Sequence, residues 1–326
     1  CCLTETGIPP TSQARVCWRH LRILMCDCLV ALPALSASGK TLFAKNSDRP
    51  RHENQIIRWN PSRRDREDIH ATYIPVAPHA QHTLACVLSL PEWCWGAEHG
   101  VNEAGVAIGN ETIYTIDDPR TAPDALIGMD LVRLGLERAA TAYEAVQVLS
   151  ELMTTYGQGG SGHDTRGDAP RRPYWSSFLI ADPTDAWVVE TSGRVVESMQ
   201  VTTTWAISNR TTIPTFDATY RHPKQPVHLL VDPRLNASRS VLAQSPVNVG
   251  DLQTHLSSHV GGDNGWTVCM HAESNGEVVE QTTASMIAEL DTNESLVWWA
   301  QGSPCVTPYQ QARFSELSQR LDAVAR

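Results

Sequence analysis

The sequence predicts a single α+β domain in which sheets and helices are stacked in layers. Three observations support this fold class. Strand-like apolar runs come first, two helical patterns follow them, and more strand-like runs fill much of the second half. No internal repeat and no clear linker interrupts the chain. Its 326 residues are enough to bury a sizeable core.

The first predicted unit, after 25 residues without periodicity, is a β-hairpin. In residues 26–32 (CDCLVAL) the alternate positions 26, 28, 30 and 32 share one face of a strand. The segment SASGK supplies a turn, and residues 41–47 (TLFAKNS) return as a second strand. This hairpin brings Lys45 to Asp48 back towards Cys26.

The rest of the chain divides by composition and periodicity. Thr141 and Glu144 have the spacing of a capping box before the second helix. The predicted elements are irregular structure at 51–80, buried strands at 82–90 and 105–114, helices at 124–139 and 142–157, a flexible loop at 157–173, strands at 176–182, 186–192, 194–201 and 205–210, a helix at 248–260, strands at 284–290 and 295–302, and a helix at 308–325.

Composition narrows the class of partner. Hydrophobic residues make up 41% and charged residues 19% of the chain, as in an ordinary globular protein. The formal net charge is −10 and the basic residues are scattered, which argues against nucleic acid or an anionic membrane as partner. No stretch is long and apolar enough to predict a membrane span.

The nine cysteines are an odd number with no CxxC pair, which indicates reduced thiols in a reducing compartment. We therefore expect a cytoplasmic protein. The alternative is a signal peptide, because basic residues precede the run ILMCDCLVALPAL and the segment ALSA resembles a cleavage site. Asp27 and Pro33 interrupt that run and favour the first interpretation.

Cofactor and metal motifs are weak in this sequence. His79 and His82 have the spacing of metal ligands, but no cysteine or carboxylate accompanies them, so exposed loop histidines are the simpler interpretation. The GQGG segment lacks the lysine of a phosphate-binding loop. His271 is a candidate neighbour of the substrate pocket. We expect no cofactor and no metal.

Cys26 is the candidate nucleophile. If Met25 is the true start and is removed, Cys26 carries both a thiol and a free α-amine. A thiol with a pKa near ~8.5 and an α-amine near ~7.7–8.0 are both poised around neutral pH. Amide hydrolysis needs a nucleophile and a group that accepts and returns its proton, and such a residue supplies both. The alternative is a buried strand thiol without chemistry.

Several motifs in order resemble the secernin and dipeptidase family of cysteine N-terminal-nucleophile (Ntn) hydrolases. They cover the chain from about Cys26 to Pro304. The motifs are CDCLVALP at 26, FAKNSDRP at 43, WCWGAEHGVNEAGVAIGNE at 93, GMDLVRLGLERA at 128, YGQGG at 156, SSFLIADPTDAWVVET at 176, ISNR at 207 and TTASM at 282. The resemblance implies a four-layer αββα sandwich with Cys26 at the start of a central strand.

The resemblance also implies a set of site residues around Cys26. Lys45 and Asp48 stand where related bile-salt hydrolases and penicillin acylases have an arginine and an aspartate. A cation favours the thiolate, and a carboxylate can hold the α-ammonium. Asn110 and Asn209 would donate to the oxyanion, and Arg239 would complete the site. From the residues alone, turn-forming asparagines and a solvated arginine remain alternatives.

Cys28 departs from the family, where threonine is usual two residues after the nucleophile. It shares a strand face with Cys26. We interpret Cys28 as a packing residue and not as a second nucleophile.

The resemblance implies a dipeptidase in residues 26–326, with residues 1–25 either a propeptide to be removed or an extension that is not made. The substrate would be a small peptide or amide. One alternative is an acylase for N-acyl amides; the other, since animal secernins are associated with exocytosis, is a non-enzymatic regulator. The resemblance also implies homo-oligomer contacts, although secernins carry a longer tail after the segment GSPCVTPYQ.

Overall fold

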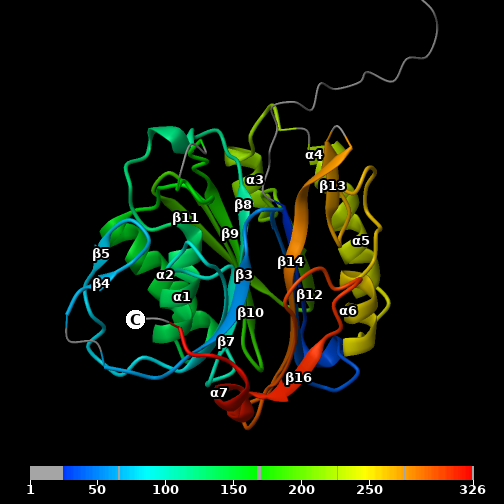
Figure 1. The fold of residues 1–326 in the computed structure, drawn as a ribbon, viewed down its shortest axis with the longest axis horizontal. Helices are drawn as coiled ribbons and strands as arrows, with labels where there is room; N and C mark the ends of the chain where they lie inside the picture. Colours follow the sequence, from blue (N-terminus) through cyan, green and yellow to red (C-terminus); the bar gives the residue numbers. More distant parts are fainter. Residues whose placement is uncertain (1–24, 65–66, 167–169, 226, 275, 325–326) are drawn as a thin grey trace, which may run out of the picture.

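The computed structural model describes residues 25–64, 67–166, 170–225, 227–274 and 276–324. The predicted N-terminal extension, 1–25, therefore lies outside the described residues except for Met25. Two β-sheets face each other at the centre, and helices cover their outer faces (Figure 1). This arrangement is the predicted four-layer αββα sandwich.

Each large sheet has seven strands, and neighbouring strands are antiparallel. The first sheet has the order β12-β1-β2-β14-β15-β16, with β13 paired to β14. Its strands are β1 (Cys26–Ala31), β2 (Thr41–Pro50), β12 (Thr204–Ile207), β13 (His271–Ser274), β14 (Glu277–Leu290), β15 (Leu296–Ala300) and β16 (Gln310–Arg313).

The second sheet has the order β11-β10-β9-β8-β7-β6-β3. Its strands are β3 (Gln55–Asn60), β6 (Cys86–Pro91), β7 (His99–Asn102), β8 (Ala107–Ile113), β9 (Trp175–Ala181), β10 (Ala186–Ser192) and β11 (Val195–Val201). A separate two-stranded sheet pairs β4 (Ile69–His70) with β5 (Pro75–Val76).

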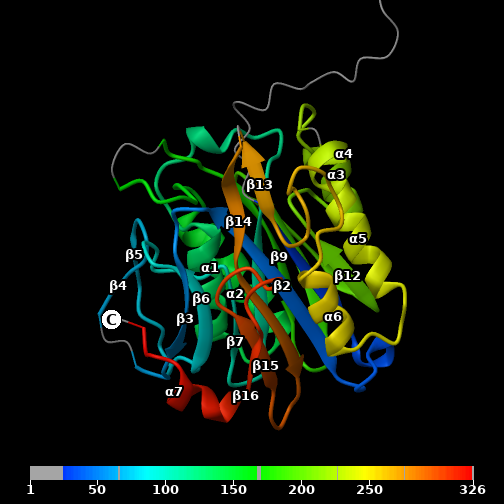
Figure 2. The same cartoon turned by 45° about the vertical axis from the view of Figure 1, so that its right-hand side comes forward.

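Helices flank the sheets on both sides (Figure 2). The helices are α1 (Gly128–Arg138), α2 (Ala142–Tyr156), α3 (Pro214–Tyr220), α4 (Val227–Leu230), α5 (Asp232–Leu242), α6 (Val249–Leu256) and α7 (Leu317–Arg320). Apolar residues of α1 and α2 pack on the second sheet, and those of α5 and α6 pack on the first. Within the described part of the chain, no helix combines the length and apolarity that a membrane crossing requires.

The alternation of β1 sets which side chains reach which layer. Cys28 and Val30 join the core between the two sheets, whereas Leu29 and Ala31 pack towards α5 and α6. Both faces are covered, so every residue of β1 is buried. Cys26, in phase with Cys28, therefore lies on the face towards the second sheet.

The predicted hairpin is confirmed, with Cys26 opposite Ser47 and Cys28 opposite Lys45. The helix predicted over 308–325 is wrong. There β16 pairs with β15 and forms the edge of the first sheet, and only the 3-10 turn Phe314–Glu316 and the short α7 follow it. Ala312 and Phe314, two residues apart, are buried while Arg313 is exposed, so the local period is that of a strand.

Other differences concern segments predicted to be irregular. The region 51–80 contains β3, an edge strand of the second sheet. In the loop predicted as flexible, residues 157–163 are buried, and 167–169 lie outside the described residues. Arg49 holds this loop, since its Nη2 donates to the carbonyl oxygen of Gly162 at 2.8 Å and its Nη1 to Glu98 Oε1 at 2.7 Å.

Candidate active site

The β1–β2 hairpin places Cys26 beside Asp48. Cys26 is only 3% exposed, and its Sγ accepts a hydrogen bond from the backbone N–H of Asp48 at 3.4 Å. Burial raises the pKa of the Cys26 thiol well above its usual value; Lys45 lowers this pKa, while Glu111, Glu98 and Asp48 raise it further. The thiol is therefore protonated at neutral pH in this form of the chain.

Lys45, in phase with Cys28 across the hairpin, is fully buried beside the second sheet. Its Nζ donates to the carbonyl oxygen of Asn110 at 2.8 Å and to Glu111 Oε1 at 3.1 Å. The same Glu111 oxygen accepts from the Cys28 thiol at 2.9 Å. Burial raises the pKa of Glu111 to about 7, although Lys45 opposes the shift. The chain thus places an acid between Lys45 and the thiols.

Asn110 does not point into this cluster. Along β8, Ala107 and Ile113 join the core between the sheets, whereas Ile108 packs with α1 and α2. The side chain of Asn110 follows Ile108, because a Cβ placed on Gly128 of α1 would lie 2.4 Å from Asn110 Oδ1. The geometry does not support the oxyanion role predicted for Asn110; its contribution is a backbone carbonyl for Lys45.

Asn209 follows β12 and contacts the backbone nitrogen of Cys26. Its Oδ1 accepts from Cys26 N at 2.9 Å, and its Nδ2 donates to the carbonyl oxygen of Thr112 at 3.0 Å. The amide nitrogen is therefore engaged, and the amide oxygen faces the backbone nitrogen of Cys26. Asn209 thus lies beside Cys26, with no free amide donor for the predicted oxyanion role.

The arginine at this site is Arg234 on α5 and not Arg239. Arg234 is fully buried, and its Nη1 donates to Asp27 Oδ2 at 2.7 Å and to the Cys26 carbonyl oxygen at 3.3 Å. Its Nη2 donates to Asn209 Oδ1 at 2.9 Å. Arg239 is exposed on the opposite face of the same helix, so its predicted place in the site is wrong.

One carboxylate oxygen of Asp48 accepts a hydrogen bond, and the other has no hydrogen-bond donor. Its Oδ1 accepts from Thr282 Oγ1 at 2.6 Å, while its Oδ2 has no hydrogen-bond partner and lies 3.9 Å from Arg234 Nη1. Burial raises the pKa of Asp48 well above its usual value, although Arg234 and Thr282 lower it. A buried carboxylate oxygen without a donor can accept an additional cation or N–H group.

The residue before Cys26 fills an apolar space. Met25 is 1% exposed and clusters with Val231, Met270 and Ala272, with Tyr114 packed against the same cluster. Tyr114 also lines a cavity of about 690 Å³ whose other lining residues include three arginines. These arginines are Arg120, Arg171 and Arg172.

Sequence reasoning missed two of the buried charged groups, Arg234 and Glu111. Signals for both existed. Val231, Leu235 and Leu242 have helical spacing, which places Arg234 on the apolar face of α5. The alternation of β8 places Glu111 on the same face as Gly109, opposite to Asn110.

No family model matches the sequence. The fold is similar to that of penicillin V acylase from Agrobacterium tumefaciens, with 14% identity, a TM-score of 0.53, and coverage of 91% of this chain and 90% of that chain. It is also similar to a variant of conjugated bile acid hydrolase from Clostridium perfringens, with 10% identity, a TM-score of 0.52, and coverage of 92% and 95%. The chain therefore has the α+β sandwich fold of the Ntn hydrolases.

Proposed function

We propose that this chain is a cysteine-dependent amide hydrolase, most specifically a dipeptidase, with Cys26 as N-terminal nucleophile. The observation that carries the proposal is the environment of Cys26 itself. Asn209 Oδ1 accepts from its backbone nitrogen at 2.9 Å, and the N–H of Asp48 contacts its sulfur at 3.4 Å. The nitrogen and the sulfur of Cys26, the two atoms that the reaction would use, are thus both positioned by hydrogen bonds to neighbouring residues.

The proposed reaction requires that the peptide bond between Met25 and Cys26 has been cleaved, so that Cys26 has a free α-amine. The α-amine of Cys26 takes the thiol proton, and Sγ attacks the scissile carbonyl carbon. The amine then returns the proton to the leaving nitrogen, and water hydrolyses the acyl-enzyme. Asn209 and the free Oδ2 of Asp48 are the groups proposed to orient the amine.

Two features support a small substrate with an apolar group and a carboxylate. The space filled by Met25 is lined by apolar side chains and would accept an apolar substrate side chain. The adjoining cavity is lined by Arg120, Arg171 and Arg172, which pair with Asp118, Asp124 and Glu280. A substrate carboxylate would share or displace these partners, and guanidinium groups bind carboxylates in a bidentate manner. A dipeptide has both groups.

An acylase is the second candidate, and the same apolar space favours it. Val231, Met270 and Ala272 would accommodate an acyl chain as well as an amino-acid side chain. The two candidates differ in the α-ammonium, which a dipeptide carries and an N-acyl amino acid lacks.

The test begins with intact-mass measurement and N-terminal sequencing, to establish whether the purified chain starts at Cys26. The mature chain is then assayed on dipeptides and on N-acyl amino acids that share the same C-terminal residue. We expect Cys26→Ala to abolish turnover while Cys94→Ser, which changes a buried thiol in another cluster, retains it. Turnover by Cys26→Ala would refute the proposal. A correctly started chain that hydrolyses no amide would favour the non-enzymatic regulator.

A further inference from the structure

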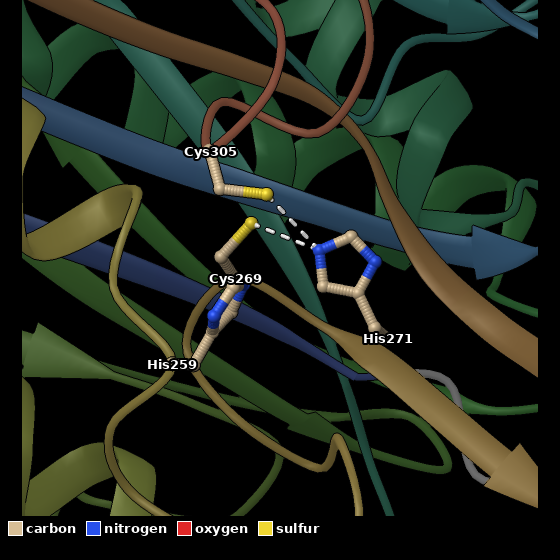
Figure 3. Close-up of side chains that lie close together, drawn as sticks. All are labelled: His259, Cys269, His271 and Cys305. Carbon is tan, nitrogen blue, oxygen red and sulfur yellow. Dashed lines mark hydrogen bonds between the residues drawn. The ribbon is translucent and has the colours of Figure 1, made fainter.

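Four soft ligands from three chain segments converge beside the candidate active site. They are His259 after α6, Cys269 and His271 around the start of β13, and Cys305 after β15. One ligand atom from each lies within 4.8 Å of all the others. Figure 3 shows both sulfur atoms directed at the imidazole of His271, with His259 on the side of Cys269.

Backbone hydrogen bonds hold these segments together without using the four side chains. The N–H of Cys269 donates to the carbonyl oxygen of Ser258 at 2.9 Å, and that of Val268 to the carbonyl oxygen of Val260 at 3.0 Å. These two bonds bracket His259. The Cys305 loop is tied to α6 by Ser257 Oγ, which donates to the carbonyl oxygen of Pro304 at 3.2 Å. The cluster is thus preorganised by the fold.

Hydrogen bonding explains only part of this geometry. His271 Nε2 lies 3.6 Å from Cys269 Sγ and 3.2 Å from Cys305 Sγ. One imidazole nitrogen carries one proton or one lone pair, so it cannot bond well to both thiols at once. A cation between the four atoms would engage them all.

We propose that His259, Cys269, His271 and Cys305 form a structural Zn²⁺ site. Zinc–sulfur and zinc–nitrogen bonds of about 2.3 and 2.0 Å place neighbouring ligand atoms of a tetrahedron roughly 3.3–3.8 Å apart. The separations from His271 Nε2 to the two sulfur atoms, 3.6 and 3.2 Å, are close to this range. All four ligand atoms lie within 4.8 Å of one another, so they would draw together by up to about 1 Å on binding. Two thiolates and two imidazoles in this arrangement select zinc over the harder magnesium and calcium ions. Four protein ligands complete the coordination, which is typical of a structural site.

The position of the site gives the zinc a role in supporting Asp48. Between Cys269 and His271, the backbone of Met270 bonds to Thr282 in both directions, at 2.8 and 3.0 Å. On the Cys305 segment, Ser303 Oγ donates to the carbonyl oxygen of Thr282 at 2.7 Å. Thr282 in turn donates to Asp48 Oδ1. Zinc binding would join the two segments that position Thr282; its importance for catalysis rests on the proposed function, but zinc binding itself does not.

The test measures zinc in the full chain carrying Cys26→Ala, so that the nucleophile cannot bind metal. The reduced protein is loaded with ZnCl₂, freed of excess metal, and analysed by elemental mass spectrometry. We expect the content to fall by about one zinc per chain when Cys305→Ser is added. Cys94→Ser is the matched control, because it removes a thiol distant from the cluster in the fold, and we expect no loss there.

A second variant and a second metal make the result independent of folding. His259 is exposed, so His259→Ala removes one ligand without opening the core, and we expect weaker zinc retention on dialysis against a chelator. Loading with Co²⁺ should give the thiolate charge-transfer absorption of a tetrahedral cobalt site in the parent and lose it in Cys305→Ser. Thermal unfolding should shift upward with zinc in the parent alone.

Three results would overturn the proposal. Equal zinc in the parent and in both ligand variants would place the metal elsewhere. No bound zinc in the reduced parent would show that the four side chains do not form a metal site. A Cys269–Cys305 disulfide that persists in the non-reducing peptide map after reductant would identify a structural disulfide instead. None of these depends on whether the chain hydrolyses amides.

Discussion

Arg234 is the residue that joins the nucleophile strand to the helical layer. It reaches from α5 to Asp27, to the carbonyl oxygen of Cys26 and to Asn209. A buried ion pair gains little over an apolar pair, but removing one partner leaves the other charge uncompensated. Substitution of Arg234 should therefore lower the free energy of unfolding substantially.

We expect Arg234→Met to lower the free energy of unfolding by about 3–5 kcal/mol, because Asp27 would stay buried without its cation. Arg239→Met, on the exposed face of the same helix, should change it by less than about 0.5 kcal/mol. Urea unfolding of both variants checks the prediction. Equal effects of the two substitutions would contradict the assignment of Arg234 to the site.

Glu111 and Lys45 act in opposite directions on the nucleophile. Glu111 raises the pKa of the Cys26 thiol, and Lys45 lowers it. We expect Glu111→Gln to lower the apparent pKa of Cys26 and Lys45→Met to raise it, because each substitution removes the charge that causes the corresponding shift. The pH dependence of Cys26 alkylation by iodoacetamide measures both. Shifts of the same sign in the two variants would refute this arrangement.

Motif similarity fixes positions along the chain but not the face of the element on which a side chain lies. Arg239 is exposed, and the Asn110 side chain lies against α1 and away from Lys45. Arg234 and Glu111 occupy the inward faces of α5 and β8. Periodicity contained that information, but only once the limits of these elements were known.

At the scale of elements, β8 approaches the nucleophile hairpin because Gly109 has no side chain. A Cβ on Gly109 would lie 2.6 Å from Cys28 Sγ, 2.9 Å from Lys45 Cδ and 3.1 Å from Phe43 Cζ. The first two distances are shorter than a Cβ tolerates and the third is tight, so a strand or the Cys28 or Lys45 side chain must move. The glycine thereby permits the contact between Lys45 and Glu111.

We expect Gly109→Ala to lower the free energy of unfolding by about 1–3 kcal/mol, as is usual for overpacking a close-packed core. The reduced entropy of the unfolded chain works in the other direction, by about 0.4–1 kcal/mol, and is the smaller term. Urea unfolding measures the net effect. An unchanged midpoint would show that β8 and the hairpin can separate without cost.

The sequence predicted elements well where a strong local period coincides with burial. The β1–β2 hairpin and the helices α1 and α2 are examples, because each presents an uninterrupted apolar face. It failed at β3 and β16, which lie at or near the edges of the sheets. Edge strands are partly exposed, and their pairing with a distant strand decides their conformation.

At the scale of the whole molecule, the charges around Cys26 are unbalanced in this form of the chain. Beside Cys26, Asp27, Asp48 and Glu111 are buried with Lys45 and Arg234, three acids against two cations; Glu98, which also raises the pKa of Cys26, is paired with Arg49. Each of the three acids has one oxygen without a hydrogen-bond partner. Cleavage of the peptide bond between Met25 and Cys26 would leave an α-ammonium group on Cys26. This group would be a third cation and would supply additional N–H donors. The site is thus suited to a chain that begins at Cys26.

The same cleavage would remove Met25 from its apolar space, and a ligand-binding experiment can detect the empty space. N-acetylmethionine, an N-acyl amino acid, carries an apolar side chain for the Val231–Met270–Ala272 cluster and a carboxylate for the adjoining arginines. At a concentration of 100 times its Kd, such a ligand would stabilise the folded protein by about 2.7 kcal/mol. We expect it to raise the thermal midpoint of a chain beginning at residue 26 and carrying Cys26→Ala, where turnover cannot consume it. The full chain with the same substitution is the matched control, because its Met25 occupies the space, and its midpoint should not change. Equal stabilisation of the two chains would mean that the ligand binds elsewhere and that Met25 does not mark the substrate site.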